Sequence, residues 1–154
     1  MRDGTLIRKI LVASDGSEIS LKAARYAAEI AACTNAEVVI LTAAEATAVT
    51  QFVTSAIPHG GSAQEEMRHT ATHVIEDTRK PFLEADVRQV HTKIIEGPAS
   101  EVILDEAKAG SYDLIAMGSR GAGAGLTQRL ILGMGSVAQR VLSSAPCPVL
   151  IVRE

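Results

Sequence analysis

The sequence predicts an α/β fold, an open doubly wound sheet of five parallel strands with helices on both faces. Short runs of branched apolar residues alternate with longer segments in which apolar residues recur every three or four positions. The short runs are apolar throughout instead of alternating with polar residues, which favours parallel strands covered on both sides. Ligands of such sheets bind beyond the carboxyl ends of the strands, at the switch point of the topology.

The first three elements follow directly from these patterns. Residues 9–13 predict a buried strand, followed by the turn former Asp15-Gly16. Apolar residues between 19 and 33 recur at spacings of four and three, which indicates an amphipathic helix that Asn35 ends. Residues 37–43 predict a second buried strand.

The middle of the chain is less regular. Residues 45–61 predict a long loop, and loops of this length are functional or mobile. Ser62 and Glu65 have capping-box spacing, so we expect a second helix to begin there. Pro81 should kink or end that helix, because proline lacks an N–H donor and clashes with the preceding turn. A third strand is expected near 87–96.

The last part of the chain predicts two helices and two strands. Pro98 is expected at the first helical position of a helix that Gly110 ends as its C′ residue. Ser136 is expected to begin the last helix, and the fourth and fifth strands are expected at 113–117 and 148–152. The first and fourth strands end at Asp15 and Gly118, so these two places are where a ligand should bind.

Composition and charge narrow the class of protein. With 154 residues, 47% of them hydrophobic, we expect one domain spanning 1–154 and no disorder. A net charge of -3 and 3% aromatic residues argue against a nucleic-acid partner. The longest strongly apolar stretch, 38–44, is far below the ~20 residues of a membrane span, so no membrane is expected. No signal peptide is recognisable, and we expect a cytoplasmic protein.

A glycine-rich segment, 118–135, carries most of the functional information. Glycines after a buried strand let backbone N–H groups approach an anion, and Gly135-Ser136 at a helix start adds donors and a hydroxyl. The alternative is a surface loop in which Ser136 is an ordinary N-cap. No Gly-Lys pair exists, which excludes a Walker P-loop. A G-x-G-x-x-A match at 133–138 leaves too few residues for a complete βαβ unit.

In order along the chain, five segments resemble the universal stress protein family. They are V12-x-x-D-G-S-x-x-S-x-x-A23, G97-P-A-S-E-V-I103, D113-L-I-A-M-G-S-R-G121, G135-S-V-A-Q-R-V141 and A145-P-C-P-V-L-I-V152. The resemblance spans nearly the whole chain and implies an adenine nucleotide alpha hydrolase-like, Rossmann-like form of the predicted sheet. It also implies the nucleotide-binding branch of the family, with ATP or AMP as ligand, with or without magnesium.

That branch has the pattern Gly-x2-Gly-x9-Gly-Ser/Thr, and the resemblance assigns its positions in this chain. The matched phosphate-binding residues are Gly118, Gly121, Gly135 and Ser136, with the Val137 backbone completing the cradle. Asp15 would lie by the ribose or adenine, with Ala13 beside it and Ala43 and Met117 against the base. Arg120 and Arg129 could assist the phosphates as charged donors.

Two alternatives stay open at this site. Thirteen residues separate Gly121 from Gly135, where the family pattern has nine, so the extra residues could leave the cradle intact or occlude it. Asp15 and Glu18 have capping-box spacing, so Asp15 could instead be the N-cap of the first helix.

The sequence supports no catalytic residues and no metal site. His69 and His73 lie four apart on a helix but are expected to be surface histidines, since no third ligand is evident. We therefore expect a sensor or regulatory protein that binds an adenine nucleotide, with an adapter of the same fold that binds none as the alternative. An apolar last strand at 149–152 predicts a homodimer formed through that strand, as does the family's habit.

Overall fold

The computed structural model describes residues 4–45, 63–121 and 134–154, and it confirms the predicted fold class. Five parallel strands form one sheet in the order β3-β2-β1-β4-β5. In chain order the elements are β1 (Lys9–Ala13), α1 (Glu18–Thr34), β2 (Glu37–Ala44), α3 (Ala63–Glu84), β3 (Val90–Glu96), α4 (Ala99–Gly110), β4 (Leu114–Gly118), α6 (Ser136–Ser144) and β5 (Val149–Val152).

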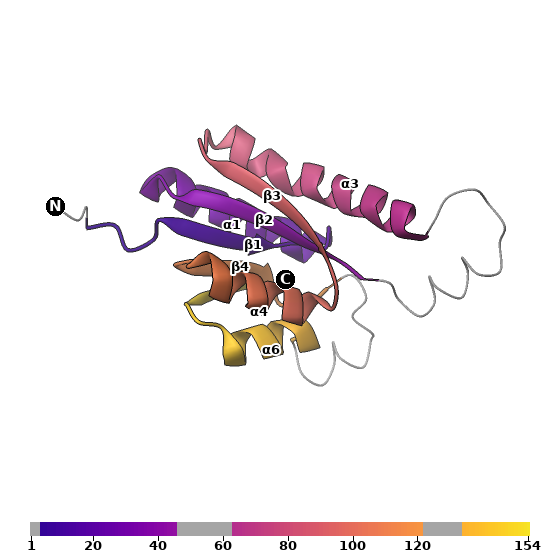
Figure 1. Ribbon diagram of the computed structural model, residues 1–154. Helices are drawn as coiled ribbons and strands as arrows, with labels where there is room; N and C mark the ends of the chain where they lie inside the picture. The colour runs from indigo at the N-terminus through magenta and orange to yellow at the C-terminus, as the bar shows by residue number, and fades with distance from the viewer. Residues whose placement is uncertain (1–3, 46–62, 122–133) are drawn as a thin grey trace.

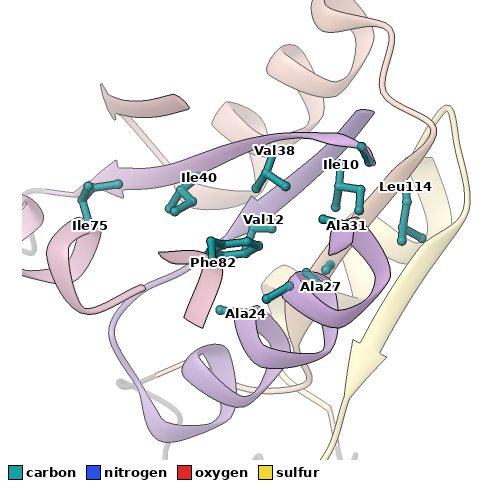
Figure 2. Close-up of a cluster of buried hydrophobic side chains, with 13 residues drawn as sticks. Ile10, Val12, Ala24, Ala27, Ala31, Val38, Ile40, Ile75, Phe82 and Leu114 are labelled. Carbon is teal, nitrogen blue, oxygen red and sulfur yellow. The ribbon is translucent and has the colours of Figure 1, made fainter. Parts of the chain in front are cut away.

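The helices cover the sheet in two layers. Helices α1 and α3 pack on one face, while α4 and α6 lie side by side on the other (Figure 1). Side chains of the central strand β1 point alternately to the two faces of the sheet. Ile10 and Val12 belong to the first core, under α1 and α3, and Leu11 belongs to the second core, under α4 and α6. Figure 2 shows the first core, with the alanines of α1 turned toward the side chains of β1 and β2. Small residues on α1 let this helix lie close to the sheet.

The topology creates a switch point between β1 and β4. These two strands are paired neighbours, with Ile10 opposite Leu114 and Val12 opposite Ala116. The helix that follows β1 packs on one face of the sheet, and the helix that follows β4 in the described structure packs on the other. The carboxyl ends of β1 and β4 therefore flank the crevice where such sheets bind ligands.

The structure corrects the expected end of the long helix. α3 continues past Pro81 to Glu84, so the proline lies inside the last turn. Only one intrahelical hydrogen bond is lost there, and the next turn is held because Phe82 is fully buried in the first core. The Ala85 N–H donates to the Pro81 carbonyl at 3.0 Å, which closes the helix one turn later than predicted.

The bounds of α4 are also corrected, while those of α1 are confirmed. Pro98 is the N-cap of α4 and not its first helical residue, and the left-handed residue that ends α4 is Ser111 at φ 53°. Gly110 is the last helical residue, and a β-carbon there would lie 2.2 Å from Tyr112 Cε2, so its glycine serves packing. Asn35 ends α1 in the left-handed conformation at φ 55°, as the sequence predicts.

Two expectations fall outside the part of the chain that the structure describes. The capping residue Ser62 and nearly all of the loop expected at 45–61 belong to the undescribed range 46–62. Among the described helices, none is long and apolar enough to cross a lipid bilayer.

Candidate functional site

A cavity of about 280 Å³ opens at the switch point, beyond the carboxyl ends of β1, β2 and β4. It is the place that the topology predicts for a ligand. All of the candidate site residues that the sequence predicts and the structure describes line this cavity. They are Ala13, Asp15, Ala43, Met117, Gly118, Arg120, Gly121, Gly135, Ser136 and Val137. The predicted residues are therefore brought together, although their role toward a ligand stays a prediction.

The turn between β1 and α1 places Asp15 at the cavity. Ser17 is the N-cap of α1, and its Oγ accepts a hydrogen bond from the Ser20 N–H at 3.3 Å. The alternative that Asp15 caps the helix is therefore wrong. Asp15 lies two residues earlier, and its Oδ1 accepts from the Ser17 N–H at 3.0 Å in an Asx-type turn. This bond holds the exposed Asp15 carboxylate at the cavity wall.

The turn after β4 brings two glycines to the cavity for different structural reasons. A β-carbon on Gly118 would lie 2.7 Å from Ile19 Cγ2 and 3.1 Å from the Ser20 backbone nitrogen, so this glycine lets β4 pass close under α1. A β-carbon on Gly121 would lie 2.8 Å from Asp15 Oδ2. The second glycine therefore lets the turn approach the carboxylate of the other wall.

The amino end of α6 forms the third side of the cavity. Its N-cap is Gly135, which has no side chain to bond the N–H groups of the first turn. The Gly135 N–H donates to the Ser119 carbonyl at 2.7 Å, so the two ends of the lengthened glycine-rich segment meet. Residues 122–133 lie outside the part of the chain that the structure describes. Whether the extra residues of this segment leave the phosphate cradle intact or occlude it therefore stays open.

Arg120 supplies positive charge next to these N–H groups. Its side chain is 15% exposed, and Nη2 lies 3.4 Å from Glu154 Oε2. Its Nε is buried without a hydrogen-bond partner in the part of the chain that the structure describes. A buried donor of this kind is costly unless something accepts from it. The predicted second arginine, Arg129, is not among the described residues.

Sequence reasoning missed several residues of the cavity wall, namely Ser14, Ser20, Leu41, Glu45, Ala99, Ile103 and Ala138. The most informative of them is Glu45, whose Oε1 accepts a hydrogen bond from the Ala99 N–H at the start of α4. Its position directly after the second strand is a signal that could have found it, since the same rule selected Asp15. A carboxylate therefore already occupies the amino end of α4, whereas that of α6 is uncapped.

Part of the cavity wall is apolar. Ala13, Ala43 and Met117 come from three neighbouring strands and face the layer of α4 and α6. Ile103 on α4 closes this side. The lining thus combines hydrocarbon surface with glycines, N–H groups and Arg120.

The described histidines, which are His69, His73 and His91, do not line this cavity. His69 and His73 stack edge to face on α3 with their ring centroids 4.6 Å apart, and His73 Nδ1 lies 3.5 Å from Glu76. Within the described ranges, no three histidine, cysteine or acidic side chains gather to hold a metal ion.

Comparison with known proteins identifies relatives over the full length of the chain. The model of the universal stress protein family matches residues 6–153. Universal stress protein MJ0531 of Methanocaldococcus jannaschii is 35% identical, with 100% of this chain and 87% of that protein aligned. Universal stress protein YxiE of Bacillus subtilis is 33% identical, with 96% of this chain and 100% of that protein aligned.

Solved structures share the fold. UspA from Lactobacillus plantarum superposes with a TM-score of 0.75 at 24% identity, over 96% of this chain and 98% of that one. A universal stress protein from Archaeoglobus fulgidus in complex with dAMP gives a TM-score of 0.69 at 19% identity, over 96% and 99% of the two chains. A family member from Arabidopsis thaliana with AMP bound superposes with a TM-score of 0.62 at 18% identity, over 96% of this chain and 92% of that one.

Proposed function

Because the chain belongs to the universal stress protein family, we propose that it binds an adenine nucleotide, ATP or AMP, as a sensory or regulatory ligand. The observation that carries this proposal is the juxtaposition, in one cavity, of the uncapped amino end of α6 and the positively charged side chain of Arg120. The N–H groups can donate to an anion and Arg120 adds positive charge beside them, and both lie at the switch point of a doubly wound sheet.

The polar end of the cavity suits a phosphate. The first-turn N–H groups of α6, at Ser136, Val137 and Ala138, have no partner within the helix, and the helix dipole adds positive potential there. Gly121 and Gly135 bring further backbone close without side chains in the way. Arg120 adds charge-assisted hydrogen bonds.

The remainder of the lining suits a nucleoside. The Asp15 carboxylate can accept hydrogen bonds from ribose hydroxyls, and the apolar wall of Ala13, Ala43 and Met117 can pack against a flat base. The fold neighbours solved with dAMP and with AMP support a nucleotide of this class as the ligand. For ATP, magnesium would be held largely by phosphate oxygens and water, as is usual for that ion.

We propose binding and not turnover as the role of this cavity. Among the described residues that line it, only the carboxylates of Asp15 and Glu45 could accept a proton from water. Glu45 is engaged at the start of α4, and Asp15 is held by the turn before α1.

We also propose that the chain acts as a single domain in the cytoplasm and forms a homodimer through β5. This strand lies at the edge of the sheet, and Val149, Leu150 and Ile151 are each only partly buried. An apolar edge strand of this kind invites pairing with a second chain.

Titration calorimetry of nucleotide-free protein with ATP and with AMP, each with and without magnesium, tests the proposal. Micromolar binding, about -8 kcal/mol, is expected for the wild type, and Arg120→Gln should weaken it about tenfold. Arg140→Gln is the matched control, because Arg140 is an arginine on α6 that is paired with Glu101 outside the cavity. Absence of heat up to millimolar nucleotide at several temperatures would refute the proposal and favour the adapter alternative.

A further inference from the structure

A buried row of hydroxyl groups joins α3 to the turn that carries Asp15. Thr78 on α3 is fully buried, and Ser14 and Ser20 are 6% and 3% exposed. The Thr78 hydroxyl lies 2.8 Å from Ser14 Oγ, which lies 3.1 Å from Ser20 Oγ. Ser14 and Ser20 line the cavity, whereas Thr78 reaches them from a helix 64 residues further along the chain.

Counting hydrogens shows which contacts depend on Thr78. The three hydroxyls make four contacts with oxygen: the two above, Thr78 to the Val74 carbonyl at 2.6 Å, and Ser20 to the Ser17 carbonyl at 2.9 Å. Three hydrogens cannot serve four contacts, and a carbonyl only accepts. The Ser20 hydrogen belongs to the Ser17 carbonyl, and the Thr78 hydrogen is shared between Ser14 Oγ and the Val74 carbonyl, so the Ser14 hydrogen is the one left for Ser20 Oγ.

Ser14 passes this restraint to the turn. Its Oγ accepts a hydrogen bond from the Gly16 N–H at 3.3 Å, and Gly16 directly follows Asp15. With Thr78 present, Ser14 Oγ can accept from the Thr78 hydroxyl and from the Gly16 N–H while its own hydrogen is directed to Ser20 Oγ. Thr78 thereby fixes the orientation of the Ser14 side chain, and Ser14 fixes the backbone next to Asp15.

A second contact from α3 bears on the same turn. Gly16 has a φ of 80°, and a β-carbon there would lie 2.9 Å from Val74 Cγ2. Val74 is the residue whose carbonyl contacts the Thr78 hydroxyl, so one turn of α3 holds the Asp15 turn through both packing and hydrogen bonding. The remainder of the turn is restrained by α1 through the cap at Ser17.

We propose that Thr78 is a positioning residue that orders the turn carrying Asp15 for binding of the nucleotide. This inference rests on the proposed function, because Asp15 contacts a ligand only if the cavity binds one. Thr78 itself does not line the cavity, and it acts through Ser14 and Gly16.

The test compares three variants on α3. Thr78→Val keeps the shape of the side chain but removes its hydroxyl, and Ser14 keeps Ser20 and Gly16 as partners, so the protein should fold. Thr78→Ser restores the hydroxyl. Thr72→Val is the matched control, because the exposed Thr72 makes the same bond to a carbonyl four residues back, at 2.8 Å, and its hydroxyl has no second hydrogen-bond partner among the described residues.

Two readouts separate this inference from the proposed function. Amide hydrogen exchange of residues 14–20 in ligand-free protein should speed up in Thr78→Val alone. The affinity for AMP should fall about tenfold in Thr78→Val, the loss expected from one hydrogen bond, and remain within about twofold in the other two variants. In an Asp15→Asn background, Thr78→Val should cost much less, because the residue that it positions is already altered.

The outcomes are distinguishable. A wild type that binds neither ATP nor AMP contradicts the proposed function, while the exchange data still decide whether Thr78 orders the turn. A wild type that binds, with Thr78→Val binding equally well or exchanging no faster at 14–20, overturns the positioning role. Equal losses in Thr78→Val with and without Asp15 also overturn it.

Discussion

The Asp15 carboxylate lies so close to the α-carbon of Gly121 that a β-carbon on that glycine would stand 2.8 Å from Asp15 Oδ2. The two residues come from the turns after β1 and β4, and both line the cavity. A small change at Gly121 is therefore a way to move the Asp15 side chain without touching the core.

Gly121→Ala should weaken AMP binding about tenfold and leave the melting temperature nearly unchanged. The added methyl group meets the end of a flexible side chain, which can rotate away at little cost to stability but then leaves its position at the cavity. The backbone of Gly121 is not in the left-handed region, so alanine introduces no strain there. Calorimetric affinity and thermal unfolding of the same samples check the prediction.

Gly118→Ala is the contrasting variant. Its methyl group would meet Ile19 Cγ2 at 2.7 Å and the Ser20 backbone nitrogen at 3.1 Å, and backbone cannot move aside cheaply. We expect a loss of about 1–3 kcal/mol in the free energy of unfolding, as for other overpacked sites. If Gly121→Ala loses stability as Gly118→Ala does, the contact with Asp15 is not the feature that makes residue 121 a glycine.

Removing the charge of Glu154 should strengthen nucleotide binding. Arg120 Nη2 lies 3.4 Å from Glu154 Oε2, and a phosphate in the cavity would compete with this carboxylate for the guanidinium. Glu154 is 64% exposed, so the pair is weak, and Glu154→Gln should raise the affinity by no more than about fivefold. The gain should shrink as salt is added, because the pair is screened.

A matched control for this charge effect lies at the other end of the sheet. Glu37→Gln removes a carboxylate paired with His91, at the start of β2, where it cannot compete for Arg120. Calorimetry at low and high salt on both variants makes the comparison. An equal gain in both would mean that the net charge of the protein, and not the Arg120 pair, sets the affinity.

The fold was predictable because its signals are local. Each buried strand is an apolar run, and Asn35 marks the end of α1 within its own turn. The errors occur where distant packing decides. The sequence predicts that Gly110 ends α4 as the residue after the helix, but Ser111 takes that left-handed position. Residue 110 is a glycine because the Tyr112 ring lies against it.

The candidate site was predictable only in part, for the same physical reason. Asp15 follows from the rule that ligands meet the carboxyl ends of parallel strands, and that rule applied to the second strand would also have given Glu45. Thr78 could not be found in this way, because its hydroxyl meets Ser14 only after α3 packs on the sheet. A buried threonine on a helix carries no local signal of its partner.

Acidic substitution of β5 should produce monomers. Val149→Asp with Ile151→Asp places charges on the edge strand through which we propose that two chains pair. Ile151→Lys is the milder variant, since its long aliphatic stem can stay against the protein. Leu83→Asp is the control, because Leu83 is 59% exposed on α3, which packs at the other end of the sheet. Sedimentation velocity that finds an unchanged dimer in folded β5 variants would exclude this interface.

Glu106 should make the stability of the protein depend on pH in the acid range. Burial disfavours its charged form, but hydrogen bonds from Lys93 Nζ at 2.7 Å and the Tyr112 hydroxyl at 2.6 Å outweigh this effect, and the pKa of Glu106 is held below its usual 4.5. Its carboxylate therefore stabilises the fold fully above pH 4.5. As the pH falls below that value, the unfolded chain takes up a proton first. The stabilisation by Glu106 is therefore lost once the pH has fallen through the pKa of this residue in the folded protein.

Glu106→Gln should consequently lower the free energy of unfolding at pH 7 by about 1–3 kcal/mol, the value of hydrogen bonds to a charged group. The difference from the wild type should shrink between pH 5 and pH 3, as measured by urea unfolding. Asp77→Asn is the control, because hydrogen bonding to Lys80 also lowers the pKa of Asp77, but the pair is exposed and screened by water. A difference at Glu106 that stays constant with pH would show that the lost contacts do not depend on the ionised carboxylate.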